Sequence, residues 1–443
     1  NIGVGGRLME RFALSRMKEW KENENRKPLI IRGARQVGKT WIMKTFGQQY
    51  FEKTAYVNFD NNARMKQVFE GDLDIERLVL SISAETGVSI EAENTLIIFD
   101  EVQEVPKALT SLKYFYENAP QYAIVAAESL LGVALHQGTS FPVGKVDFLD
   151  LYPLNFREFL CAMGEKQFVS MLDSCDTQMV TVFKTKYIER LREYYFVGGM
   201  PEVVKDFSEK KDYNRVRAIQ KNLINYYQQD FSKHAEIKLV PRLNLVWNSI
   251  PMQLAKENKK YIYGQVREGS RAKDFELAIQ WLLDCGLIHK VQRIQKPDLP
   301  LKAYIDFDAF KLFLVDIGLL IAMTDLDAKV IIEGNKIFTE FKGALTEQYI
   351  LQQLISDVGV IPYYYSTQNS KGEIDFLVQG KTSVIPIEVK AEENLKAKSL
   401  KAFCEKYQPS YAVRTSMSDY REQDWMTNIP LYAVKWIKNY VNQ

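Results

Sequence analysis

The chain has 443 residues, of which 46% are hydrophobic and 26% are charged, and its net charge is +2. This length suffices for two or three domains with separate cores, and the composition is that of an ordinary globular protein. No apolar run approaches the roughly 20 residues of a membrane span, and the N-terminus lacks the regions of a signal peptide, so we expect no membrane partner. The near-zero charge does not indicate nucleic-acid binding, although it is compatible with a local basic patch.

The cysteines and histidines are scattered along the sequence. The cysteines form no CxxC pair, which argues against a zinc site and fits buried free thiols in a reducing cytoplasm. The histidines are isolated, so none is a persuasive catalytic base or metal ligand. These residues are Cys161, Cys175, Cys285 and Cys404, and His136, His234 and His289.

The first predicted element is a buried parallel strand at residues 28–31, followed by a complete GxxxxGK[ST] pattern and a helix at 41–46. A glycine turn between a strand and a helix N-terminus directs backbone N–H groups and the positive helix end at an anion. Lys39 is expected to neutralise the outer phosphates of a nucleotide, and the Thr40 hydroxyl to hold Mg²⁺. The alternative is a glycine turn without a ligand. The phosphate loop consists of Gly33, Ala34, Arg35, Gln36, Val37, Gly38, Lys39 and Thr40.

A second apolar strand, at residues 95–99, ends in Asp100 and Glu101. P-loop NTPases place a carboxylate at such a strand end, so Asp100 is expected to orient the water shell of the metal. Glu101 is placed to polarise a water molecule against the γ-phosphate, and two adjacent acids favour ATP hydrolysis over nucleotide storage. The alternative is a solvated turn or a helix N-cap. Further strands at 54–59 and 122–127 alternate with helices and predict a doubly wound α/β sheet.

The middle of the chain, residues 161–330, is dominated by helical periodicity. Two short strands, at 287–291 and 302–304, follow these helices, and helices followed by a small β-ribbon indicate a winged helix. Nearby basic residues are expected either to contact a phosphate backbone or to form a solvated face. The helices are predicted at 184–195, 216–231, 249–255 and 272–283, and the basic residues are Arg267, Arg271 and Lys273.

Taken together, the motifs resemble those of prokaryotic AAA+-type ATPases that carry a C-terminal domain of unknown function (DUF4143-type). The resemblance covers nearly the whole chain, and it implies that Ser129 acts as a sensor of the γ-phosphate. Relatives commonly have glycine before this serine, whereas this chain has Glu128, which is expected to disturb the sensor or to repel the phosphates. The resemblance also implies a finger residue near the end of the nucleotide domain, where Lys145 stands; the alternative is a solvated lysine. The motifs are the phosphate loop, 98–103, 129–132, 152–159, 198–201 and 311–320.

The C-terminal section contains a second group of chemical residues on two predicted strands, 372–378 and 384–390. Because side chains alternate along a strand, Glu388 and Lys390 face the same side, and an in-register hairpin brings Asp375 beside them. Paired carboxylates bind Mg²⁺ through oxygen, and a neighbouring lysine stabilises developing charge or orients a water for attack on phosphorus.

A further carboxylate, Glu347, lies on a predicted helix at 344–355. The arrangement resembles the PD-(D/E)xK nuclease superfamily, which implies metal ligation by Asp375 and Glu388, catalytic support from Lys390 and an auxiliary acid at Glu347. Two alternatives stay open: the same fold without activity, and a chance pattern of alternating charges.

We therefore predict an α/β protein with three parts. A P-loop NTPase (AAA+-like) parallel sheet at 1–160 is followed by a helical and winged-helix section at 161–330, and then by a restriction-endonuclease-like α/β domain at 331–443. The predicted function is ATP hydrolysis with Mg²⁺, on or with DNA, in the cytoplasm; oligomerisation is left open. The alternative is a nucleotide-dependent switch or scaffold with an inactive nuclease-like domain and a protein partner.

Overall fold

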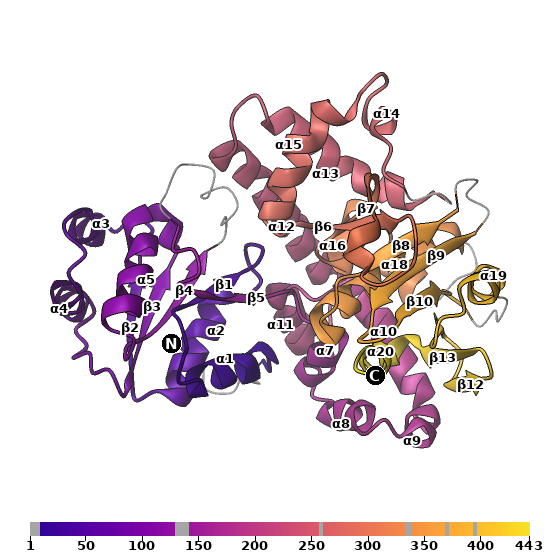
Figure 1. Ribbon diagram of the computed structural model, residues 1–443, viewed down its shortest axis with the longest axis horizontal. Coiled ribbons are helices and arrows are strands. Elements are labelled where there is room, and N and C mark those ends of the chain that lie inside the picture. Colours follow the sequence, from indigo (N-terminus) through magenta and orange to yellow (C-terminus); the bar gives the residue numbers. More distant parts are fainter. Residues whose placement is uncertain (1–8, 129–140, 257–259, 334–338, 368–371, 393–396) are drawn as a thin grey trace. The chain divides into compact units, whose positions relative to one another are not determined.

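The computed structural model describes residues 9–128, 141–256, 260–333, 339–367, 372–392 and 397–443 (Figure 1). The chain divides into two compact units. One consists of Arg11–Tyr152 and Asp284–Leu287, and the other is formed mainly by Pro153–Leu283 and Ile288–Gln443. Among the helices of these described ranges, none has the length and apolar character needed to cross a bilayer.

The first unit is built on a five-stranded sheet with the strand order β2-β3-β4-β1-β5. Every neighbouring pair in it is parallel, and the four strands predicted from apolar runs are present to within one or two residues. The carboxyl ends of parallel strands lie at one edge, so the ends of β1, β3 and β4 come together there. The strands are β1 Leu29–Arg32, β2 Lys53–Asn58, β3 Thr95–Asp100, β4 Ala123–Glu128 and β5 Asp147–Asp150.

Helices cover this sheet because alternate strand residues point to opposite faces. On one face, Ile97, Phe99 and Ile124 pack in a single core with residues of α3, α4 and α5. Phe59, Phe69, Phe99 and Phe115 meet edge to face within this core. The helices are α1 Ala13–Glu22, α2 Lys39–Tyr50, α3 Ala63–Glu70, α4 Ile75–Thr86 and α5 Pro106–Asn118.

The second unit begins with a run of helices that contains all four helices predicted for this part of the sequence, in α10, α12, α13 and α15 (Figure 1). The helices are α7 Phe156–Ala162, α8 Lys166–Ser174, α9 Thr177–Val182, α10 Lys184–Val197, α11 Pro201–Lys210, α12 Tyr213–His234, α13 Val240–Leu254, α14 Tyr263–Val266 and α15 Ala272–Asp284.

An eight-stranded mixed sheet follows, with the order β12-β13-β11-β10-β9-β8-β6-β7. The strands are β6 Ile288–Ile294, β7 Ile305–Leu314, β8 Tyr363–Ser366, β9 Glu373–Gln379, β10 Val384–Val389, β11 Val413–Ser416, β12 Arg421–Gln423 and β13 Met426–Pro430. The other helical elements are α16 Ile317–Met323, α17 Ala328–Ile332, α18 Thr339–Gln353, the π-helical turn Leu354–Val358, α19 Lys398–Tyr407, the 3₁₀ segment Leu431–Trp436 and α20 Ile437–Val441.

The sheet corrects two sequence-based expectations. The β6–β7 hairpin is not a separate ribbon, because β6 pairs in parallel with β8 through Arg293 and Tyr364. The predicted boundary at residue 330 therefore separates strands that share one sheet. Residues 302–304 were expected to be a strand, but they belong to the 3₁₀ turn Leu301–Tyr304, and β7 begins only at Ile305.

Two of the motifs, 198–201 and 311–320, meet at a buried carboxylate. Asp316 is fully buried, and it accepts hydrogen bonds from the backbone N–H of Gly199 (2.6 Å) and Leu319 (3.1 Å) and from the Gln352 side chain (3.2 Å). A Cβ on Gly198 would lie 2.2 Å from Asp316 Oδ1, and φ of Gly198 is +73°, so only glycine fits there. Burial raises the pKa of Asp316 to about 6, although these hydrogen bonds oppose the shift. The two motifs therefore stabilise the fold by holding the turn at Gly199 against the start of α16.

We expect Asp316→Ala to lower the free energy of unfolding by roughly 3 kcal/mol, because it leaves buried N–H groups without acceptors. Urea unfolding followed by circular dichroism measures the change. Asp325→Asn is the surface control, since the Asp325 side chain pairs with Lys221 at the surface, is 72% exposed and has a left-handed φ of +52° that asparagine also adopts; a decrease within about 0.5 kcal/mol is expected there. Equal decreases in the free energy of unfolding of the two variants would contradict the structural role of Asp316.

Candidate functional site

The phosphate loop joins the carboxyl end of β1 to the first turn of α2. Gly38 is the N-cap of α2 and has φ of +94°, a left-handed conformation that glycine adopts without steric cost. A Cβ on Gly33 would lie 2.2 Å from the carbonyl oxygen of Leu151. Both glycines of the pattern are therefore required by the backbone, which leaves the N-terminus of α2 open to an anion.

Lys39 is held inside this loop. Its side chain is 7% exposed, and Nζ donates to the carbonyl oxygens of Gly33 and Ala34, each at 2.8 Å. Burial lowers the pKa of Lys39 to about 8, while the carboxylates of Glu101 and Asp100 act in the opposite direction. The ammonium group thus stays mostly charged at neutral pH, and its neutral carbonyl partners can be exchanged for phosphate oxygens.

Thr40 and Asp100 are brought together as predicted. Thr40 Oγ1 donates to Asp100 Oδ2 (2.7 Å), and the Tyr56 hydroxyl, from β2, donates to the same oxygen (2.9 Å). A hydroxyl and a carboxylate at this separation supply the oxygen ligands that Mg²⁺ prefers, so the residues fit that ion. The sequence does not indicate this role of Tyr56, because no motif in β2 distinguishes it from other tyrosines in strands.

Glu101 directly follows β3 in an unusual conformation. Its φ and ψ of +53° and +45° are left-handed, which costs a non-glycine residue of order 1 kcal/mol and is found more often at functional sites. Its carboxylate accepts a hydrogen bond from the Gln103 side chain. Phe99 pairs with Ala126 in the parallel register of β3 and β4, so these two strands end side by side, and the charge of Glu101 acts on Glu128 at the end of β4.

Two further candidates belong to the end of this unit. Ser129, the expected sensor, lies outside the described residues. Lys145 forms an ion pair with Glu117 (2.9 Å) and has 37% of its side chain exposed. The role of Lys145 as a finger residue stays a prediction. The observed ion pair at the surface is equally compatible with the alternative, a solvated lysine.

Glu128 is a buried acid at the end of β4. It is 1% exposed, and within the described part of the chain neither carboxylate oxygen has a hydrogen-bond partner. Burial, and then the negative charge of Glu101, raise the pKa of Glu128 to about 8, while Lys39 opposes the shift. The carboxyl group is therefore neutral at pH 7. The repulsion of phosphates that the sequence predicts from Glu128 is expected only when this group ionises.

Arg11 supports the loop from outside the motif. Its guanidinium, 4% exposed, donates to the carbonyl oxygens of Val37 (3.0 Å) and Tyr152 (2.6 Å). Arg11 stands 22 residues before the pattern begins, and no sequence signal connects it with the loop.

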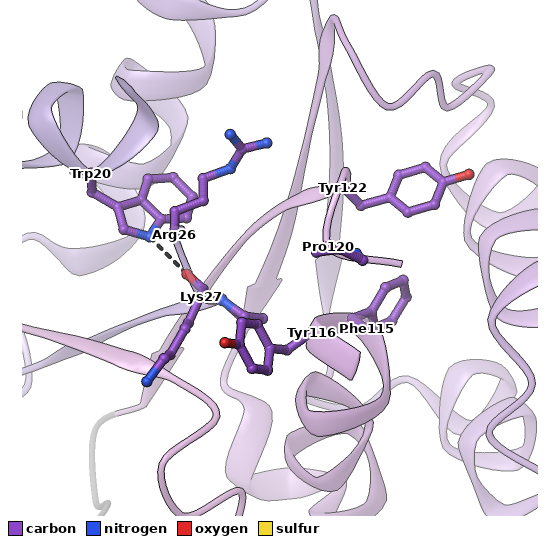
Figure 2. Close-up of a pocket in the computed structure, with 8 residues that line it drawn as sticks. Trp20, Arg26, Lys27, Phe115, Tyr116, Pro120 and Tyr122 are labelled. Atoms are coloured by element: carbon purple, nitrogen blue, oxygen red, sulfur yellow. Dashed lines mark hydrogen bonds between the residues drawn. The ribbon is translucent and has the colours of Figure 1, made fainter. Parts of the chain in front are cut away.

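Figure 2 shows a pocket at the opposite edge of the same sheet. Pro28 and Tyr122 directly precede β1 and β4, so this pocket lies at the amino ends of the strands, away from the phosphate loop. The Trp20 indole N–H donates to the Lys27 carbonyl there (2.7 Å). No predicted site residue lines it. The lining residues are Trp20, Arg26, Lys27, Pro28, Phe115, Tyr116, Pro120 and Tyr122.

In the second unit, the structure gathers the three residues predicted on the β9–β10 hairpin. The strands are antiparallel with Phe376 opposite Ile387, and Asp375 and Glu388 are the residues adjacent to this pair. Asp375 Oδ2 accepts from the backbone N–H of Val389 (2.7 Å), and Lys390 Nζ lies 2.8 Å from Glu388 Oε1. Alternation and register thus produced the expected proximity.

Glu347 lies on α18, as predicted, but it is placed beside a cation. Lys311 Nζ, on β7, is 3.8 Å from Glu347 Oε2 and also forms an ion pair with Glu373 of β9. Lys311 is fully buried and was absent from the sequence-based site. Its motif was recognised, but an isolated lysine in an apolar strand carries no signal of its partners. Within the described ranges, no group of three or more His, Cys, Asp or Glu residues is arranged to hold a metal ion.

We expect Glu128→Gln to bind ATP with wild-type affinity at pH 7 and about tenfold more tightly than wild type at pH 9, because wild-type Glu128 is then ionised beside the phosphates. Titration calorimetry at both pH values measures this. Arg32, the β1 neighbour of Glu128, pairs with Asp150 in both proteins. Lys39 titrates in the same range, and the charge of Glu128 raises its pKa, so the pH dependence of the affinity ratio reports the coupled pair of Glu128 and Lys39. An affinity ratio independent of pH would contradict a titrating Glu128.

Comparison with family models supports the expected AAA-type ATPase domain and the expected DUF4143 domain. Residues 25–160 match the AAA domain model AAA_14, residues 188–330 match a domain of unknown function (DUF8612), and residues 342–434 match another (DUF4143). No curated protein matches the chain.

Several solved structures are similar over most of their length. The Walker-type ATPase paby2304 of Pyrococcus abyssi is 14% identical, with a TM-score of 0.45, over 73% of this chain and 99% of its own. The ADP form of the Aeropyrum pernix ORC2 protein is 12% identical, with a TM-score of 0.33, over 79% and 97%. The RuvB Holliday junction branch migration motor of Thermotoga maritima is 11% identical, with a TM-score of 0.28, over 62% and 87%. The family models, together with the parallel sheet and its phosphate loop, support a P-loop ATPase of AAA type that carries a C-terminal DUF4143 domain.

Proposed function

We propose that the chain binds ATP at the carboxyl edge of the parallel sheet and hydrolyses it. The observation that carries this proposal is the convergence of Lys39, Thr40, Asp100 and Glu101 at that edge, with Thr40 Oγ1 and Asp100 Oδ2 2.7 Å apart. An ordinary glycine turn would need neither the buried ammonium nor the paired acids.

Each residue has a separate part in the proposed reaction. The backbone N–H groups at the start of α2 bind the phosphates, and the Lys39 ammonium exchanges its contacts with Gly33 and Ala34 for phosphate oxygens. Thr40 and Asp100 would hold Mg²⁺, which when bound neutralises charge on the phosphates. Glu101, held in its left-handed conformation, orients a water molecule for in-line attack and accepts its proton.

Substitutions should separate binding from hydrolysis. We expect Lys39→Ala to lose nucleotide affinity, whereas Glu101→Gln binds ATP normally and hydrolyses it at least about 100-fold more slowly, since only proton acceptance is removed. Phosphate release and binding of a fluorescent ATP analogue provide the measurements. Glu104→Gln, an exposed acid three residues on, is the matched control with wild-type turnover. Wild-type binding and turnover in Lys39→Ala would overturn the proposal.

We further propose that the second unit acts on or with DNA. The helices α13, α14 and α15 precede the β6–β7 hairpin in the order of a winged helix, although this hairpin belongs to the eight-stranded sheet. Asp375, Glu388 and Lys390 lie together as a nuclease-like fold requires. The alternative is a nucleotide-dependent switch that binds a protein partner. The carboxylates of this unit are paired with lysines, which leaves them less available to a catalytic metal ion. These ion pairs favour a unit that contacts DNA or a protein partner without cleaving DNA.

We expect DNA to raise the rate of ATP turnover and ATP to change DNA retention. The exposed Arg267, Arg271 and Lys273 beside α15 should contribute through phosphate contacts, so replacing all three by alanine should weaken binding and reduce the slope of log K against log salt by about one for each phosphate-binding side chain replaced. A triple alanine variant at Lys186, Lys205 and Lys210, also exposed, removes equal charge as a control. An ATP turnover rate that DNA does not change, together with no retention of DNA by the protein, would favour the nucleotide-dependent switch.

A further inference from the structure

Lys311 lies on β7, an edge strand of the eight-stranded sheet, and its ammonium group is enclosed by carboxylates. Only 1% of its side chain is exposed. Glu347 approaches it from α18 at 3.8 Å, and Glu373 approaches it from β9 in a shorter ion pair. On another side, Nζ lies 4.7 Å from the centroid of the Tyr364 ring. The carboxylates therefore come from two elements distant in sequence and meet at one cation.

The surroundings keep this ammonium group charged. Burial alone would lower the pKa of Lys311, because a charged group loses its hydration in a low-dielectric interior. The negative charges of Glu347, Glu373 and Asp375 outweigh burial and hold the pKa above its ordinary value. Lys311 thus carries its positive charge throughout the physiological pH range, and the carboxylates around it are compensated from within the protein.

The negative charge of Glu388, on the neighbouring strand β10, is also compensated by cations of the protein. Lys390 pairs with Glu388 at 2.8 Å. On the other side of β10, Glu388 is in register with Arg414 of β11, which is 1% exposed. Burial lowers the pKa of Arg414, and the negative charge of Glu388 opposes this shift. Seven residues make up what we call the C-terminal charge cluster: Lys311, Glu347, Glu373, Asp375, Glu388, Lys390 and Arg414.

A divalent cation does not fit this cluster well. Its four carboxylates share three cations, so a net charge near −1 is left, whereas the binding of a hard dication is favoured by uncompensated carboxylates. Two carboxylate oxygens of the cluster are buried and, in the described part of the chain, accept no hydrogen bond: Glu347 Oε2 and Glu388 Oε2. Glu347 Oε2 is ion-paired with Lys311 at 3.8 Å, and the charges of Lys390 and Arg414 lie beside Glu388, so both oxygens already face a cation of the protein.

We propose that Lys311 takes the place of a divalent cation among Glu347, Glu373 and Asp375, so that the cluster is an internal ion-pair network that takes up no metal. The nuclease-like unit then holds its strands together through charge and does not cleave phosphodiester bonds at this position.

Mn²⁺ binding to the full chain without nucleotide tests this proposal. Electron paramagnetic resonance reports free Mn²⁺ directly. We expect wild type and Asp375→Asn to leave the same concentration of free ion. Lys311→Met, which keeps side-chain length but removes the charge, should bind one Mn²⁺ at least about tenfold more tightly than wild type. That gain should disappear in Lys311→Met combined with Asp375→Asn, and Lys302→Met, at an exposed lysine, is the control.

Two results would overturn the proposal. One is a Mn²⁺ ion bound by wild type and released in Asp375→Asn or Glu388→Gln. The other is a folded Lys311→Met variant that gains no Mn²⁺, which would show that the ammonium group does not stand in for an ion. If Lys311→Met does not fold, the comparison of wild type with Asp375→Asn decides the matter. Because nucleotide is omitted, neither result depends on whether the chain hydrolyses ATP.

Discussion

Parallel pairing of β1, β4 and β3 is the constraint on which the nucleotide site depends. Parallel strands place their carboxyl ends at one edge, and each of these three strands carries a different chemical group there. β1 leads into the phosphate loop, β3 ends in Asp100 and Glu101, and β4 ends in Glu128. Backbone hydrogen bonds between strands therefore set the distances between groups that lie far apart in sequence, and Arg11 secures the loop by binding the Val37 carbonyl.

Buried lysines have opposite roles in the two units. Lys39 contacts neutral carbonyl oxygens, so burial dominates and lowers its pKa. Such partners are weak, and the ammonium group is available to a phosphate. Lys311 contacts carboxylates, which outweigh burial and raise its pKa. Its partners carry full negative charges, so its ammonium group is already neutralised within the protein interior. The partners, rather than burial itself, decide whether a buried ammonium serves a ligand or the fold.

Buried carboxyl groups follow the same logic. Glu128 has no hydrogen-bond donor among the described residues, and burial therefore keeps it neutral up to about pH 8. Asp316 is equally buried but is surrounded by backbone and side-chain N–H groups, so its pKa rises only to about 6. One acid is left responsive to the charge of its surroundings, while the other fastens the N-terminus of α16 to the turn at Gly199.

The sequence by itself determined the features encoded by neighbouring residues. The phosphate loop is contiguous, so Lys39 and Thr40 were assigned without knowledge of the fold, and the two-residue alternation of a hairpin was enough to place Asp375 beside Glu388 and Lys390. Only the tertiary structure decided which groups meet across long separations. Lys311 and Glu347 are joined by the packing of α18 against the sheet, and the β6–β8 pairing merges what the sequence divides at residue 330. Periodicity describes how a segment is buried, but the partners of a buried charge are fixed by strand order and helix packing, which no local pattern contains.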